Sequence, residues 1–202
     1  MKVLLINGSP RAHGNTFTAL SEVAKALNSD GIDTEIIWIG NKPIPGCIAC
    51  NKCQETGVCV FNTGVYTELL EKLPAADGII AGSPTYWAGP NGSLCALLDR
   101  VFYSLSRFLQ YKPAAAVGIC RRGGSVCTVE RLNKYFEMNN MPMPSSQYWN
   151  NAFGSQPGDV SRDEEGLQTM RTLGHNMARL LKSLENVPRP EAEIHAWTNF
   201  IR

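Results

Sequence analysis

The sequence predicts an α/β fold in which a five-stranded parallel sheet carries helices on both faces. Short, nearly continuous apolar runs suit strands that are buried on both sides. They alternate along the chain with longer segments whose apolar residues recur at helical spacing. Five strands in a doubly wound sheet favour the order 2-1-3-4-5. Ligands then bind at the switch point between the first and third strands, outside the carboxyl ends of the strands.

The predicted strands are apolar runs bounded by loops rich in Gly, Ser, Asn or Pro. In chain order they occupy residues 2–7, 34–39, 78–81, 114–120 and 143–148. The first run is apolar almost throughout and ends at Gly8, as expected for a central strand followed by a turn.

The predicted helices carry their apolar residues on one side. In chain order they occupy residues 17–27, 65–73, 91–102, 125–139 and 163–184. The last is the longest, and its apolar side consists of Leu167, Met170, Leu173, Met177, Leu180 and Leu181. Such a helix is expected to cover one face of the sheet.

The length of 202 residues suits a single domain over residues 1–202. Two segments fall outside the alternating pattern. A cysteine-rich loop occupies residues 43–64, and a tail over residues 185–202 contains Trp197, Phe200 and Ile201.

The composition is that of an ordinary globular protein, with 44% apolar and 18% charged residues. The net charge of +1 gives no reason to expect nucleic acid or a membrane surface as a partner. No apolar stretch approaches the length of a membrane span, so we expect a cytoplasmic protein. In that reducing compartment, the odd number of 7 cysteines favours metal or redox roles over a disulfide framework.

The loop over residues 8–16 follows the first strand and opens a helix, which is a favourable place for an anion. Ser9, Asn15 and Thr16 can donate hydrogen bonds, and Arg11 adds a positive charge. The loop lacks both the G-x-G-x-x-G and the Gly-Lys-Ser/Thr patterns, so a single terminal phosphate suits it better than a dinucleotide. The alternative is an ordinary helix N-cap at Asn15 or Thr16.

Two further loops end at the same edge of the predicted sheet. The loop over residues 82–90 holds Pro84, Thr85, Tyr86 and Trp87, whose aromatic pair can form a flat wall for a ring. The alternative is that these aromatic residues cover the sheet edge or pack in a subunit contact. The loop over residues 121–124 brings Gly123 and Gly124, with two arginines, towards the same crevice, unless it is an ordinary glycine turn.

The cysteine-rich loop contains the run C-x2-C-x2-C-x5-C, formed by Cys47, Cys50, Cys53 and Cys59. Three thiols at every third residue cannot all pair with one another, but they can converge on one metal centre. A zinc site is the second interpretation, although zinc ribbons usually divide their ligands into two distant pairs. A cysteine loop without metal is the third interpretation.

These motifs together resemble a known family. Residues 8–11 with 14–16, and then residues 82–87, are similar to the flavodoxin-like NAD(P)H-dependent FMN reductases. The cysteine run resembles the iron–sulfur flavoprotein branch of that family. The cysteine run departs from the bacterial ferredoxin pattern in two ways. Its last gap has five residues instead of three, and Val60 stands where that pattern has proline.

The resemblance implies a site for each of two cofactors. The FMN phosphate would bind Ser9, Arg11, Asn15 and Thr16. The isoalloxazine ring would lie against Pro84, Thr85, Tyr86 and Trp87, with Gly123 and Gly124 nearby. A [4Fe–4S] cluster would be held by Cys47, Cys50, Cys53 and Cys59, because thiolates are the usual ligands of such clusters.

The predicted function is that of an FMN-dependent NAD(P)H oxidoreductase with a small acceptor such as a flavin, a quinone or a nitro compound. The alternatives are an iron–sulfur electron carrier between protein partners and a non-catalytic flavin- or metal-binding module. Because the flavin carries the chemistry, no catalytic side chain is expected. The choice between NADH and NADPH stays open, although Arg121 or Arg122 suits an extra phosphate. The resemblance also implies a homodimer or homotetramer with the flavin near a subunit interface.

Overall fold

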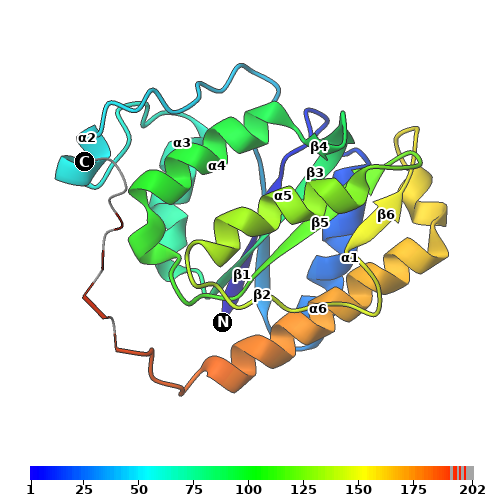
Figure 1. Ribbon diagram of the computed structural model, residues 1–202. Coiled ribbons are helices and arrows are strands. Elements are labelled where there is room, and N and C mark those ends of the chain that lie inside the picture. Colours follow the sequence, from blue (N-terminus) through cyan, green and yellow to red (C-terminus); the bar gives the residue numbers. More distant parts are fainter. Residues whose placement is uncertain (192, 195, 197, 199–202) are drawn as a thin grey trace.

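The computed structural model describes residues 1–191, 193–194, 196 and 198; Trp197, Phe200 and Ile201 of the predicted tail lie outside them. Five parallel strands form one sheet in the order β2-β1-β3-β5-β6 (Figure 1). Their bounds are β1 (Lys2–Asn7), β2 (Asp33–Trp38), β3 (Gly78–Tyr86), β5 (Ala114–Cys120) and β6 (Asn151–Phe153). A two-residue strand, β4 (Gly89–Pro90), pairs antiparallel with the end of β3. The predicted order 2-1-3-4-5 is confirmed for the parallel strands.

The central strands are apolar throughout because both of their faces are buried. In β1, Leu4 and Ile6 belong to the core on one face of the sheet, whereas Val3 and Leu5 belong to the core on the other. This alternation is the two-residue period of a strand. All four side chains are 0–1% exposed.

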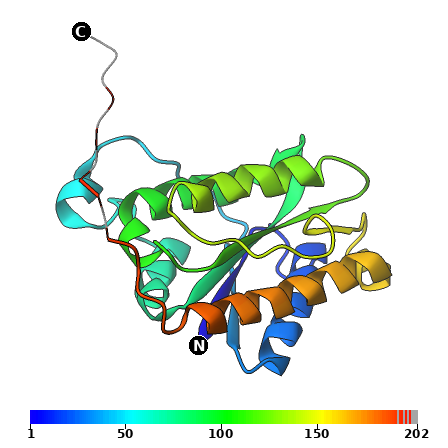
Figure 2. The ribbon, with the colours of Figure 1, turned by 60° about the horizontal axis from the view of Figure 1, so that its bottom comes forward.

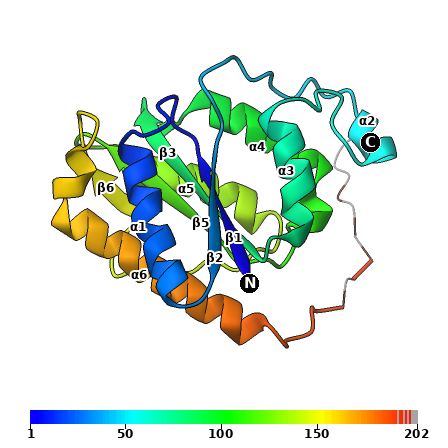
Figure 3. The same cartoon turned by 180° about the vertical axis from the view of Figure 1, so that it is seen from behind.

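Helices cover both faces of the sheet (Figure 2). One face carries α1 (Asn15–Ser29) and α6 (Glu164–Leu184), which lie side by side in Figure 3. Gly174 of α6 permits this close packing, since a Cβ there would lie 2.6 Å from the Cβ of Ala26. The other face carries α3 (Val65–Lys72), α4 (Gly92–Ser104) and α5 (Ser125–Glu137).

The cysteine-rich loop contains one short helix, α2 (Lys52–Thr56), at one end of the molecule (Figure 1). Three 3₁₀ turns complete the described elements, at Leu73–Ala75, Ser106–Phe108 and Asp159–Arg162. Within the described part of the chain, no helix has both the length and the apolar character needed to cross a membrane.

Two predicted strand positions were wrong. Residues 143–148 form a loop, and the last strand is β6 instead. Pro144 has no N–H group for a sheet, and the Ser146 hydroxyl bonds locally to the carbonyl oxygen of Tyr148 at 2.6 Å. In addition, β3 continues beyond residue 81 to Tyr86, so the predicted second loop is partly a β-hairpin.

Candidate functional site

A crevice of about 290 Å³ lies at the carboxyl ends of β1, β3 and β5, where the strand order predicts a ligand site. Its lining includes predicted residues from two loops, namely Ser9, Arg11, Asn15, Thr16, Pro84, Thr85 and Tyr86. Arg121 lines it from the end of β5, and Gly154 and Ser155 line it from the loop after β6. The fold therefore brings the two most motif-like loops of the sequence to one cavity.

Buried polar groups hold the first loop in shape. The Asn7 side chain is 0% exposed, donates to the carbonyl oxygen of Ala12 at 3.0 Å and accepts from the Ser9 backbone at 3.1 Å. The Ser9 hydroxyl oxygen accepts from the Arg11 backbone at 3.1 Å. The Trp38 indole N–H, which sequence reasoning did not single out, donates to the Ser9 carbonyl oxygen at 2.7 Å. The loop is thus preorganised, and the Ser9 O–H stays available as a donor.

Helix α1 begins in this crevice without a side-chain cap. Its N-cap residue is Gly14, and no side chain accepts from the first turn. The ordinary N-cap at Asn15 or Thr16 is therefore not observed. The first backbone N–H groups of a helix have no partner within the helix and favour an anion. Thr16 is only 2% exposed and still lines the cavity.

The Asn15 side chain holds a second loop in place. Its amide nitrogen donates to the Gln156 carbonyl oxygen at 2.9 Å, and its oxygen accepts from the Val160 backbone at 3.3 Å. Both functions of the amide are used in fixing the loop after β6 against α1. The Asn15 side chain, which was predicted to meet a phosphate, thus also supports the wall of the crevice, and its amide nitrogen keeps a second N–H.

The loop after β6 was missed by the sequence analysis. The Asp159 carboxylate accepts from the backbone of Gln156 at 2.7 Å and of Ser155 at 3.0 Å. These two backbone bonds, followed by the bond from Arg162, lower the pKa of Asp159. The signal that could have found the loop is its run of Gly, Ser, Pro and Asp after the last strand, because all parallel strands end at this edge.

The hairpin between β3 and β4 turns at Trp87 and Ala88, whose φ angles are 53° and 57°. Both residues are left-handed, as in the two-residue hairpin turns that usually employ Gly or Asn. Such a conformation stores backbone strain. The Trp87 side chain is fully exposed and lies outside the crevice lining, whereas Tyr86 lines it.

Gly123 and Gly124 also lie outside the lining. Gly124 has a φ of 88°, and a Cβ there would lie 3.1 Å from the Cα of Ala88. It therefore packs against the hairpin and supports it. The Thr128 hydroxyl of α5 donates to the Thr85 hydroxyl at 2.9 Å and fixes the hairpin from the same side.

The four cysteines of the predicted metal site line one cavity of about 90 Å³. Cys47 and Cys50 are exposed, and Cys53 and Cys59 are half-buried. The backbone N–H of Ala49 donates to the Cys47 sulfur at 3.5 Å. Across the described ranges, no group of three or more Cys, His, Asp or Glu side chains is arranged to hold a metal ion. Four thiols that border one cavity are a donor set that suits either a zinc ion or an iron–sulfur cluster, so the fit to a metal centre rests on the chemistry of these side chains.

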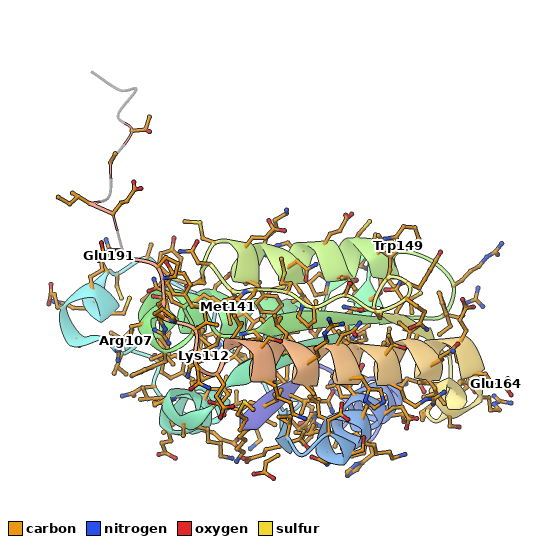
Figure 4. The ribbon with its side chains drawn as sticks, turned by 90° about the horizontal axis from the view of Figure 1, so that it is seen from below. Arg107, Lys112, Met141, Trp149, Glu164 and Glu191 are labelled. Carbon is orange, nitrogen blue, oxygen red and sulfur yellow. The ribbon has the colours of Figure 1, made fainter. Side chains whose placement is uncertain are left out.

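Helices α3 and α4, with the 3₁₀ turn that follows α4, hold the last part of the cysteine loop. The Cys59 backbone donates to the Tyr66 hydroxyl at 2.9 Å, and that hydroxyl lies 2.6 Å from the Ser104 hydroxyl. Arg107 donates to the Gly57 carbonyl oxygen at 2.9 Å. Figure 4 shows Arg107 beside the cysteine loop at one end of the molecule.

The sheet order and the crevice at its switch point define a flavodoxin-like protein, and solved structures share this fold. RosB with its bound intermediate has a TM-score of 0.73 at 13% identity, covering 99% of this chain and 92% of that chain. A flavodoxin from the domain Archaea has a TM-score of 0.60 at 16% identity, covering 90% of this chain and 99% of that chain.

Sequence comparison identifies the family. The profile described as NADPH-dependent FMN reductase matches residues 1–155. An iron–sulfur flavoprotein from Methanocaldococcus jannaschii is 36% identical over 195 residues, which is 92% of this chain and 100% of the relative. The chain therefore belongs to the NADPH-dependent FMN reductase family, and the predicted resemblance to its iron–sulfur flavoproteins is confirmed.

Proposed function

We propose that this chain is an FMN-dependent oxidoreductase that passes electrons from NAD(P)H to a small acceptor such as a flavin, a quinone or a nitro compound. The observation that carries the proposal is the crevice at the switch point. One end of the crevice is formed by Arg11 and the uncapped start of α1, and one wall is formed by Pro84, Thr85 and Tyr86. The family description supports the same function.

The phosphate of FMN would occupy the end of the crevice at α1. The free N–H groups of the first turn favour a negative charge there. Ser9 and Thr16 would add hydroxyl donors, and Arg11 would add a charge-assisted hydrogen bond. Asn15 would contribute its backbone N–H and the second N–H of its side-chain amide, since one N–H already holds the loop after β6.

The isoalloxazine ring would lie against Pro84, Thr85 and Tyr86. Trp87 would extend this wall beyond the cavity, and Gly123 and Gly124 would lie behind the hairpin that carries it. When bound, the flavin would supply the redox chemistry by accepting a hydride from the nicotinamide and passing electrons onward. The role of the chain is then to orient the ring and to leave one face open to both reactants.

The nicotinamide nucleotide would approach beside Arg121. This side chain lines the crevice and also an adjoining hollow of about 440 Å³ that contains Arg162. Arg121 suits a phosphate of the dinucleotide, whereas Arg162 is paired with Asp159 in the same hollow, so the choice between NADH and NADPH stays open.

A second candidate function is that of an iron–sulfur electron carrier. The observation that favours it is the single cavity shared by Cys47, Cys50, Cys53 and Cys59. These cysteines would hold a [4Fe–4S] cluster that exchanges electrons with the flavin and with a protein partner.

We also propose a homodimer or homotetramer with the crevice near a subunit contact. Tyr86 is 48% exposed and Trp87 is fully exposed at the hairpin beside the crevice. Large exposed aromatic side chains are enriched where proteins meet. Light scattering of the FMN-loaded protein would give the mass of the assembly.

The enzyme and the carrier differ in their reductant. Mixing the FMN-loaded protein with NADPH or NADH under anaerobic conditions should bleach the flavin absorbance rapidly and in proportion to nucleotide concentration. Arg121→Met should raise the NADPH concentration needed for half-maximal rate by about tenfold, since a charged hydrogen bond contributes about 1.5–3 kcal/mol. Reduction by ferredoxin alone, with no response to either nucleotide, would favour the carrier and refute the enzyme.

A further inference from the structure

Arg100 of α4 is a buried charge that the flavin crevice does not use. Its side chain is 3% exposed. One terminal nitrogen donates to the Phe61 carbonyl oxygen at 2.7 Å, and the guanidinium lies over the Tyr66 ring at 5.3 Å from the centroid. Within the described part of the chain, its Nε has no hydrogen-bond partner and the guanidinium has no carboxylate partner. A buried charge without an opposite charge is costly.

The cavity that Arg100 lines identifies its missing partner. It is the cavity of the four cysteines, and its lining has no charged side chain apart from Arg100. Arg100 also borders a hollow formed by residues 38–45 and 63–65, which contains Lys42 and no acidic residue. Neither space is lined by an acidic residue, and the cysteines become negatively charged when they bind a metal centre as thiolates.

This inference rests on the proposed cluster site. We propose that Arg100 is the counter-charge of the [4Fe–4S] cluster held by Cys47, Cys50, Cys53 and Cys59. Its guanidinium compensates the charge of the thiolates, and its Nε–H donates to a sulfur in the cavity. Nearby positive charge and hydrogen bonds to sulfur both raise the reduction potential of such clusters. Arg100 is a positioning and tuning residue and not a ligand.

A purely structural role predicts a different behaviour. Arg100 could serve simply as an anchor for the Phe61 carbonyl group. Arg107 is the matched control, because it anchors the neighbouring Gly57 carbonyl and lies over the Phe108 ring at 4.3 Å. Arg107 is exposed and lies outside the lining of the cysteine cavity. If anchoring were all that mattered, replacement of either arginine would have similar effects on the cluster.

The test uses wild type, Arg100→Met, Arg100→Lys and Arg107→Met, all purified without oxygen. Iron, acid-labile sulfide and the midpoint potential of the cluster are measured for each. We expect the ratio of reduced to oxidised cluster in Arg100→Met to fall about tenfold at a fixed potential, a shift of about 59 mV to more negative values for one electron. Arg100→Lys should shift less because it keeps the charge, and Arg107→Met should match wild type. Full iron content with a wild-type potential in Arg100→Met would overturn the proposal.

A second measurement covers the case in which Arg100→Met loses its iron. Unfolding by urea is compared in the loaded protein and in a variant with all four cysteines changed to Ala. Arg100→Met should destabilise the loaded protein more than the protein without the cysteines, because both lose the bond to the Phe61 carbonyl oxygen but only the loaded protein loses a counter-charge. Equal destabilisation in both backgrounds would overturn the proposal.

The cluster and the role of Arg100 can be refuted separately. A wild type that holds no iron or sulfide after anaerobic reconstitution refutes the cluster, and the role of Arg100 with it. A loaded wild type whose properties do not respond to Arg100→Met refutes only the role of Arg100. Neither result affects the FMN site.

Discussion

Arg11 is the charged side chain that would contact the flavin phosphate beside the start of α1. Arg11→Met should weaken FMN binding about tenfold and leave riboflavin binding unchanged, because a charged hydrogen bond contributes about 1.5–3 kcal/mol and riboflavin lacks the phosphate. Titration of the flavin-free protein, followed by flavin fluorescence, gives both affinities. Arg122→Met is the control, since Arg122 lies outside the crevice lining. An equal loss of FMN and riboflavin affinity would show that Arg11 does not meet the phosphate.

At the scale of single residues, local patterns predicted which side chains would gather and not what each would do. Ser9, Arg11 and Thr16 line the crevice because a loop that connects a buried strand to a helix must lie at the edge of the sheet, where the crevice is. Asn15 does too, but its side-chain partners lie 141 and 145 positions away, so no local pattern could reveal them. The unpaired charge of Arg100 likewise depends on tertiary packing.

At the scale of elements, the β3–β4 hairpin depends on Gly124. Gly124→Ala should destabilise the flavin-free protein by about 1–3 kcal/mol. Residue 124 has a left-handed backbone conformation that alanine rarely adopts, and its new Cβ would also meet the Ala88 backbone. Gly123→Ala should change stability by less than about 0.5 kcal/mol, since the space around it is open. Urea unfolding measures both. Similar stabilities of the two variants would mean that the hairpin is not supported at this point.

The elements that the sequence predicted best are those with the strongest pattern. Strands β1 and β5 have the expected bounds, because long apolar runs leave no doubt about burial. Strand β6 was misplaced because it has only three residues and exists through pairing of Asn151–Phe153 with residues 118–120. Such an edge strand is fixed by its neighbour and not by its own composition.

At the scale of the whole molecule, α4 connects the two proposed cofactor sites. The side chain of its N-cap, Asn91, donates to the Gly8 carbonyl oxygen at 2.7 Å beside the first crevice loop. Arg100 lines the cysteine cavity nine residues later, which is about 14 Å along a helix axis. One rigid helix would thus fix the distance between cluster and flavin within a subunit.

The acid stability of the molecule should depend on Glu35, which joins three elements. Hydrogen bonds from Lys2 and then from Lys72 hold the pKa of Glu35 below its usual value. The resulting stabilisation is present above the unfolded pKa of about 4.3 and is lost as pH falls through the folded pKa. Glu35→Gln should therefore reduce the loss of stability between about pH 5 and pH 3, by a fraction of a kcal/mol for so exposed a pair.

The measurement is urea unfolding at several pH values, compared with Glu130→Gln. Glu130 is an exposed residue of α5 that takes part in no ion pair within the described ranges. An identical pH dependence in the two variants would show that Glu35 does not contribute to the loss of stability at low pH.

We propose that the chain holds FMN in the switch-point crevice and, as the second candidate function requires, an iron–sulfur cluster in the cysteine cavity. The most direct test is the cofactor content of protein purified without oxygen. We expect about one FMN, four irons and four sulfides per chain, with iron lost and FMN retained when Cys47, Cys50, Cys53 and Cys59 are changed to Ala. Loss of FMN together with iron would contradict two separate sites, and protein that takes up neither cofactor on reconstitution would contradict the account as a whole.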